Sequence, residues 1–282
     1  MKPIKLISDS TCDLSSNIIK KRNIEIIPMH VSFGDERYLD GVNITVDTLY
    51  QKVEETGDLP KSAAISPGEF EEVFKRFLDE GYQILYLGIG AQFSGTFQSA
   101  NLAKTLLESE DIYLVDSANL SSGIGLLLLK ASDMIEEGLN IDEIVASLEA
   151  TVPKVRSQFV IDTLEYLYKG GRLNALSNFM GNMLRLHPLI KVVDGKMIVG
   201  KKISGAMRKA VRYMVNETIS NQDKIESDYI MITHSKAEKN ADYIRQNVVN
   251  NMSVNNLLET KAGCTISTHC GAGTIGILYI EK

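Results

Sequence analysis

Four short stretches of the sequence place a hydroxyl, an imidazole or a guanidinium group beside glycine or beside an expected helix start. These groups belong to Ser62, Ser94, Arg172 and His269. Hydroxyl and imidazole groups both donate and accept hydrogen bonds, and a helix start offers unpaired N–H groups. The set is therefore suited to holding an anion, although each residue alone also fits a helix cap, a surface charge or a structural histidine.

The stretch Ser94-Gly95-Thr96 has the most informative position. It follows an expected strand at residues 83–89 and begins an expected helix. Ligands of open α/β sheets bind at the carboxyl ends of the strands, and helix N-termini favour negative charge. The pattern indicates an anion site at Ser94, with a simple capping role as the alternative.

The string GAGTIG at residues 271–276 matches the dinucleotide fingerprint G-x-G-x-x-G. That fingerprint requires a long helix after the glycines, whose N-terminus meets the pyrophosphate. Only ILYIEK follows Gly276, and this segment has the composition of a strand. We therefore predict no dinucleotide site, but a tight turn after His269 that presents backbone N–H groups.

Metal binding and serine hydrolysis are the other chemistries that these residues suggest. The spacing of Cys264 and Cys270 is not that of a zinc site, and adjacent residues of an extended chain, such as His269 and Cys270, point to opposite faces. No metal site is expected. A lipid-ester hydrolase using Ser94 and His269, with an acid such as Asp9, remains the alternative function, although the G-x-S-x-G elbow is absent.

The elements that position these groups alternate between strand and helix in the first half. Ser66, Pro67 and Glu69 form a capping box before an expected helix, and Asp194-Gly195 predicts a β-hairpin turn. We expect two α/β domains, at residues 1–155 and 156–282. The first should contain a mostly parallel sheet with helices on both faces, and the second a mixed sheet with helices.

Composition limits the classes of partner. The 30 Lys and Arg against 36 Asp and Glu give a net charge of −6, which disfavours nucleic acid and stable membrane association. The most apolar run, 124–129, is too short to span a bilayer, and no signal peptide is apparent. Three cysteines without a framework spacing are typical of a reducing cytoplasm.

Six short stretches of the sequence, taken together and in order, resemble the bacterial DegV family over nearly the whole chain, about residues 3–280. They are SDSTCDL, SPGEF, SGTFQSA, VDS, TLEYLYKGGR and the terminal H-x-G-x-G-x-x-G.

The resemblance implies a protein that binds one long-chain fatty acid, such as palmitate, stearate or oleate, and needs no cofactor. The family includes the fatty-acid-binding subunit of bacterial fatty acid kinase, which is not itself an enzyme. A separate ATP-binding subunit phosphorylates the carboxylate, and transient membrane contact is compatible with such a role. The resemblance places the carboxyl at Ser62, Ser94 and His269, with Gly95 and Thr96 beside it. Arg172 would organise the head-group network or face the kinase.

The sequence also departs from the family pattern. Only a hydroxyl, Ser62, survives from the usual motif at residues 62–65, and an expected arginine is missing or displaced to Arg208. The displaced arginine puts the link to a kinase in question more than it does the binding of the acid.

A fatty acid also needs an apolar enclosure for its tail. Burying about fourteen methylenes supplies on the order of 11 kcal/mol, from which association removes about 4 kcal/mol or more. Adaptable apolar side chains concentrate after Arg172 and are expected to line a tunnel or to serve as core. They are Leu173, Phe179, Met180, Met183 and Leu184.

Overall fold

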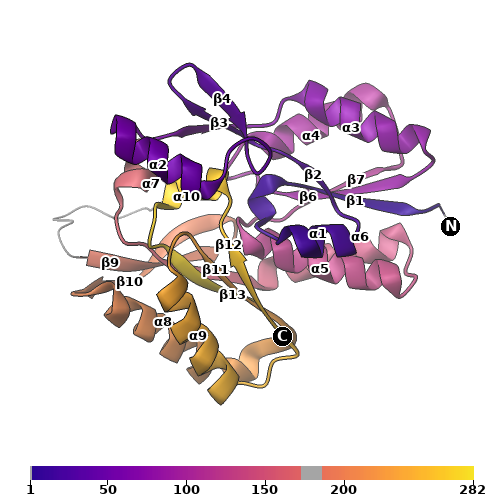
Figure 1. The fold of residues 1–282 in the computed structure, drawn as a ribbon. Helices are drawn as coiled ribbons and strands as arrows, with labels where there is room; N and C mark the ends of the chain where they lie inside the picture. Colours follow the sequence, from indigo (N-terminus) through magenta and orange to yellow (C-terminus); the bar gives the residue numbers. More distant parts are fainter. Residues whose placement is uncertain (1, 173–185) are drawn as a thin grey trace.

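The computed structural model describes residues 2–172 and 186–282 (Figure 1). The first sheet is parallel and has the order β2-β1-β6-β7. It consists of β1 (Ile4–Asp9), β2 (Glu25–Ile27), β6 (Gln83–Gly88) and β7 (Ile112–Asp116). Helices cover both faces, so the predicted parallel sheet is confirmed.

The second sheet is mixed, as expected, with the order β10-β9-β8-β13-β11-β12. Its pairs are antiparallel except β11 with β12. The strands are β8 (Val155–Val160), β9 (Leu186–Val193), β10 (Lys196–Ser204), β11 (Ile225–His234), β12 (Asn256–Lys261) and β13 (Ile275–Glu281). Asp194 and Gly195 both have positive φ in the predicted hairpin turn, which is why glycine suits the second position.

The helices cover these sheets. They are α1 (Ser16–Lys21), α2 (Val46–Thr56), α3 (Pro67–Asp79), α4 (Thr96–Leu107), α5 (Ser122–Glu136), α6 (Ile141–Thr151), α7 (Glu165–Lys169), α8 (Met207–Ser220), α9 (Glu238–Asn251) and α10 (Cys264–Cys270). The capping box predicted at Ser66 and Glu69 is present at the start of α3. The segment LNALSNFMGNML at residues 173–184, whose sequence predicts a further helix, lies outside the described residues.

Side chains along each strand point alternately to the two faces of the sheet, so each of these two sheets packs against helices on both faces and the molecule is layered. In β6, Ile84 and Tyr86 face α3 and α4, whereas Leu85 and Leu87 face α5. In β13, Leu278 and Ile280 pack in the same cluster as α5, and the alternate residues pack toward α8 and α9. Helix α5 therefore lies between the two sheets, as Figure 1 shows.

The sandwiched position explains the composition of α5. Its segment Ile124–Leu129 is buried on every side, as expected of a helix that is apolar all round. The expected boundary near residue 155 coincides with the start of β8, but the core around α5 includes residues from both sides of it. The division into two domains stays a prediction.

A third, small sheet lies around Gly34, Asp40 and Gly41, where these residues predict a loop, and that prediction was wrong. Its order is β4-β3-β5, and its strands are β3 (His30–Phe33), β4 (Glu36–Leu39) and β5 (Lys61–Ala63). Strands of three or four residues are too short to show a clear alternation of apolar and polar residues. The sheet packs with α2 and α10 and brings Ser62 toward the second half of the chain.

Candidate functional site

A pocket of about 870 Å³, including its mouth, lies where the three sheets meet. Ser62, Ser94, Arg172 and His269 all line it, so residues separated by up to 207 positions in sequence share one enclosure. The described part of its apolar wall consists mainly of Met29, Ile89, Phe93, Leu120, Phe159, Leu167, Met197, Ile266 and Leu278.

His269 occupies a different local structure from the one expected. It lies on α10 rather than on an extended chain, and both His269 and Cys270 line the pocket. The expectation that they point to opposite faces was therefore wrong. The segment CTISTHC contains no strong helix former, so local propensity gave no helical signal, and tertiary contacts stabilise the helix instead.

The two nitrogens of the His269 imidazole have different surroundings. Its Nε2 lies 2.7 Å from the Oγ of Ser62, which is on β5. Its Nδ1 is buried and has no hydrogen-bond partner in the described part of the chain. Burial, with the positive charge of Arg172, lowers the pKa of His269 to about 4, so the ring is neutral at physiological pH.

Gly170 provides the surface against which this ring packs. A Cβ at position 170 would lie 2.5 Å from Nδ1 of His269, closer than real Cβ contacts allow. Gly171 has a φ of +70°, which favours glycine for a separate reason. The Gly-Gly pair thus lets the chain pass closely over the imidazole and turn.

Arg172 follows directly and supplies positive charge to the pocket. Its Nη1 donates to the carbonyl of Gly170 at 2.9 Å, and its side chain is half-buried. No carboxylate of the described residues forms an ion pair with it. Because His269 is neutral, the guanidinium is the charged group here that complements an anion.

Ser94 also lines the pocket, but it does not occupy the N-cap position itself. Gly95 is the N-cap of α4, and the Oγ of Ser94 accepts from the backbone N–H of Thr96 at 3.2 Å. The two hydroxyls of Ser94 and Thr96 are 2.9 Å apart. Thr96 is fully buried and orients Ser94, whereas neither Thr96 nor the exposed Gly95 is among the described pocket-lining residues.

Two buried aspartates, which the sequence analysis missed as site residues, hold the start of α10. Asp40 accepts from the N–H groups of Cys264 and Thr265 at 2.8 and 2.9 Å, and Asp13 accepts from that of Gly263 at 2.7 Å. These donors belong to a helix N-terminus and would otherwise be unpaired. Burial raises the pKa of Asp13 well above its usual range. The motif SDSTCDL, which contains Asp13, was the available signal.

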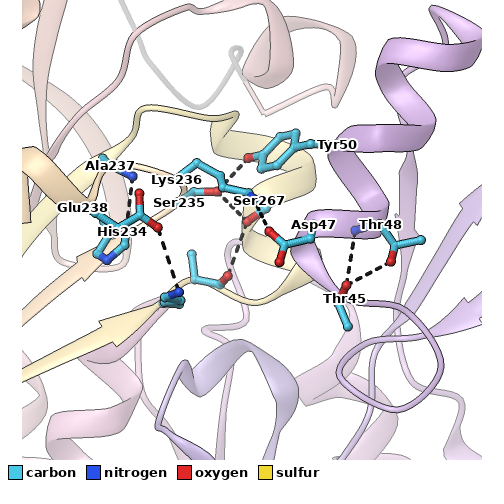
Figure 2. A network of polar contacts seen from close by, with 12 residues as sticks. Thr45, Asp47, Thr48, Tyr50, His234, Ser235, Lys236, Ala237, Glu238 and Ser267 are labelled. Atoms are coloured by element: carbon cyan, nitrogen blue, oxygen red, sulfur yellow. Dashed lines mark hydrogen bonds and ion pairs between the residues drawn. The ribbon is translucent and has the colours of Figure 1, made fainter.

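A second set of contacts anchors the middle of α10 (Figure 2). Figure 2 shows the hydroxyl of Ser235 between those of Tyr50 and Ser267, at 2.7 and 2.8 Å. Lys236 also pairs with Asp47 of α2. Helix α10 is therefore connected to α2 and to the end of β11.

The glycines after His269 form a turn, but not the predicted nest of free N–H groups. Gly271 and Gly273 have positive φ, as a tight turn requires. Their N–H groups donate to the carbonyls of Ser267 and Ser235 at 3.0 and 2.7 Å, so they are not available to a ligand. Strand β13 begins at Ile275, so a strand and not a helix follows these glycines, as predicted.

The contacts of the alternative hydrolase do not form a triad. Nε2 of His269 contacts Ser62 rather than Ser94, and Nδ1 has no carboxylate partner among the described residues. Asp9 is fully buried and bonds to Thr11, Tyr86 and Ile89. A nucleophile, a base and an orienting acid are thus not connected.

The remaining expectations concern Arg208, the residues expected to hold the tail, membrane spans and metal sites. Arg208 lines a different hollow, with Lys209, Arg212 and Tyr243. The tail residues Leu173, Phe179, Met180, Met183 and Leu184 lie outside the described residues. Within residues 2–172 and 186–282, no helix has the length and apolarity needed to cross a membrane, and no cluster of three metal-ligating side chains occurs.

Comparison with known proteins identifies the family. The model of the DegV family, described as uncharacterised proteins, matches residues 3–282, and the chain belongs to this family. A DegV domain-containing protein of Clostridium perfringens is 36% identical over the full length of both chains.

Two solved structures support the same grouping. A fatty-acid-binding DegV family protein from Thermus thermophilus is 28% identical, with a TM-score of 0.92 and complete coverage of both chains. A stearic-acid-binding protein from Eubacterium ventriosum is 26% identical, with a TM-score of 0.87, and the match covers 100% of this chain and 99% of the other.

Proposed function

We propose that this protein binds a long-chain fatty acid and presents its carboxyl group to a separate ATP-binding kinase subunit. The observation that carries the proposal is one pocket with hydroxyl, imidazole and guanidinium groups beside an otherwise largely apolar wall. Similar solved structures described as fatty-acid-binding proteins support the ligand class. The protein itself supplies binding and orientation rather than catalysis.

The head group is held by Ser62, Ser94 and His269, with charge complementarity from Arg172. A carboxylate that enters the pocket loses its hydration, and this costs several kcal/mol unless hydrogen bonds replace the water. The carboxylate can take the Nε2–H of neutral His269 from Ser62, whose hydroxyl then donates to the carboxylate as well, and the hydroxyl of Ser94 can donate a third hydrogen bond. The guanidinium then balances the negative charge.

The tail supplies most of the affinity. Each buried methylene contributes about 0.8 kcal/mol, so a chain of palmitate length is retained firmly once its carboxyl is satisfied. Leucine, phenylalanine and methionine side chains in the wall match such a ligand. The carboxyl end remains at the polar part of the pocket, where a kinase can reach it.

Mass spectrometry of ligand extracted from the purified protein, together with titration of Ser94→Ala, tests this function. We expect a long-chain acid in the wild type and an affinity about 10-fold weaker in Ser94→Ala, because a hydrogen bond to a charged group contributes about 1.5–3 kcal/mol. Ser99→Ala, on the same helix but outside the pocket lining, is the matched control. Unchanged affinity in Ser94→Ala would contradict the assignment of the carboxyl site.

A further inference from the structure

Thr265 is a buried hydroxyl residue in the pocket wall that has no side-chain partner in the described structure. It lies in the first turn of α10 and is 2% exposed, and its Oγ1 forms no hydrogen bond. Its backbone N–H is used separately, by Asp40. The other pocket-lining hydroxyls all have partners; they are Ser62, Ser94, Ser121, Thr233, Ser235 and Thr274.

The position of Thr265 relates this unpaired group to the head-group site. Thr265 precedes His269 by four residues, so the two share one face of α10 with about 5–6 Å between their Cβ atoms. Ile266 and Cys270 line the pocket beside them. A ligand whose carboxyl lies at His269 and whose chain follows this face passes Thr265 close to its carboxyl end.

We propose that the preferred ligand is a hydroxylated fatty acid, with its hydroxyl near the carboxyl end and hydrogen-bonded to Oγ1 of Thr265. The inference rests on the proposed fatty-acid function and specifies its substrate class. A plain methylene chain leaves Oγ1 unpaired in the complex, and leaving a buried hydroxyl unpaired costs free energy. A hydroxyl on the ligand removes that cost and satisfies its own hydrogen-bonding groups as well.

Calorimetric titration of the delipidated full-length chain with palmitic, 2-hydroxypalmitic and 3-hydroxypalmitic acid tests the proposal. The wild type should bind one of the hydroxy acids about 10-fold more tightly than palmitic acid, which corresponds to about 1.4 kcal/mol. Thr265→Val should abolish this preference while binding palmitic acid at least as well as the wild type. Thr265→Ser, which keeps the hydroxyl, should retain the preference.

Thr268→Val is the matched control for an effect on folding alone. Thr268 lies on the same helix, is 1% exposed and also has an unpaired Oγ1, but it does not line the pocket. This variant should keep the wild-type ratio of affinities. Equal binding of palmitic and hydroxy acids by the wild type, or a preference that survives Thr265→Val, overturns the inference alone. Failure of the wild type to bind any of these acids overturns the proposed function, and the inference with it.

Discussion

At the scale of single residues, the surroundings of His269 in the pocket determine its protonation state. Burial and the guanidinium of Arg172 both disfavour imidazolium, so His269 acts as a neutral hydrogen-bonding group. Ser62 fixes the position of Nε2, and Gly170 leaves room for Nδ1. In the proposed complex, a charged ligand therefore depends on Arg172 for charge and on His269 for direction.

This neutral state predicts a specific pH dependence of stability. The unfolded chain protonates His269 near pH 6.5, whereas the folded chain does so only near pH 4. Between these values the unfolded state binds more protons, so the free energy of unfolding falls as pH falls, by at most about 1.4 kcal/mol per pH unit. Denaturant unfolding of the delipidated wild type and of His269→Gln at pH 7.5, 6 and 5 measures the difference.

The variant isolates the contribution of one residue, because all other titrating groups are common to both proteins. His269→Gln should lose less stability than the wild type between pH 6.5 and pH 4. Parallel curves for the two proteins would mean that His269 titrates alike in the folded and unfolded chains.

At the scale of elements, α10 is a short helix whose stability comes from its surroundings. Asp40 and Asp13 pair with its first N–H groups, and Ser235 holds Ser267 in its middle. Seven residues of low helix propensity would not form a helix alone. The aspartates therefore determine where His269 is presented, although neither contacts it.

We expect Asp40→Asn to destabilise the protein by about 2–3 kcal/mol, because an amide can replace only one of the two carboxylate acceptors at the start of α10. Binding of palmitic acid should weaken as well, since His269 lies on the same helix. Chemical unfolding and calorimetric titration measure the two effects. Asp47→Asn is the control: its exposed pair with Lys236 is screened by solvent and should contribute much less to stability. Equal losses in the two variants would argue against a special role for Asp40.

The sequence could predict elements whose signals are local. The capping box at Ser66 and the Asp194-Gly195 turn each combine a residue type with a fixed spacing, and both are present. The small sheet around Ser62 and helix α10 could not be predicted in this way. Their strands are short or their propensities weak, and contacts with distant residues, such as Asp40 with Cys264, stabilise them. The co-location of Ser62, Ser94, Arg172 and His269 followed from the family resemblance rather than from spacing.

At the scale of the whole molecule, the pocket draws its walls from the mixed sheet, from the small sheet and from segments that follow strands of the parallel sheet. Residues from Met29 to Leu278 contribute, so the enclosure exists only when the chain is fully folded. The predicted parallel and mixed sheets are both present, and the DegV family is established by the match over residues 3–282. The function proposed above requires this enclosure to protect the tail of the acid and to leave its carboxyl accessible to a second protein.

The proposed function predicts that this chain binds the acid and that a separate kinase subunit transfers the phosphoryl group. The acid-loaded protein with ATP alone should form no acyl phosphate, because the described pocket offers binding groups and no connected nucleophile and base. Addition of an ATP-binding fatty acid kinase subunit from the same organism should produce acyl phosphate, trapped with hydroxylamine as the hydroxamate. Arg172→Lys and the remote Arg245→Lys form a matched pair, and only the first should reduce the yield. Acyl phosphate formed without the kinase subunit would make the protein an enzyme in its own right.

The double-sided burial of α5 has a consequence for biosynthesis. Ribosomes add roughly 5–20 residues per second, and β11 and β13 come from the chain well after Glu136. For several seconds or more, the nascent polypeptide therefore exposes one apolar face of α5, because only one of the two sheets that cover this helix has been synthesised. Chaperone capture at that stage, rather than the stability of the finished protein, would then limit how much is recovered from cells.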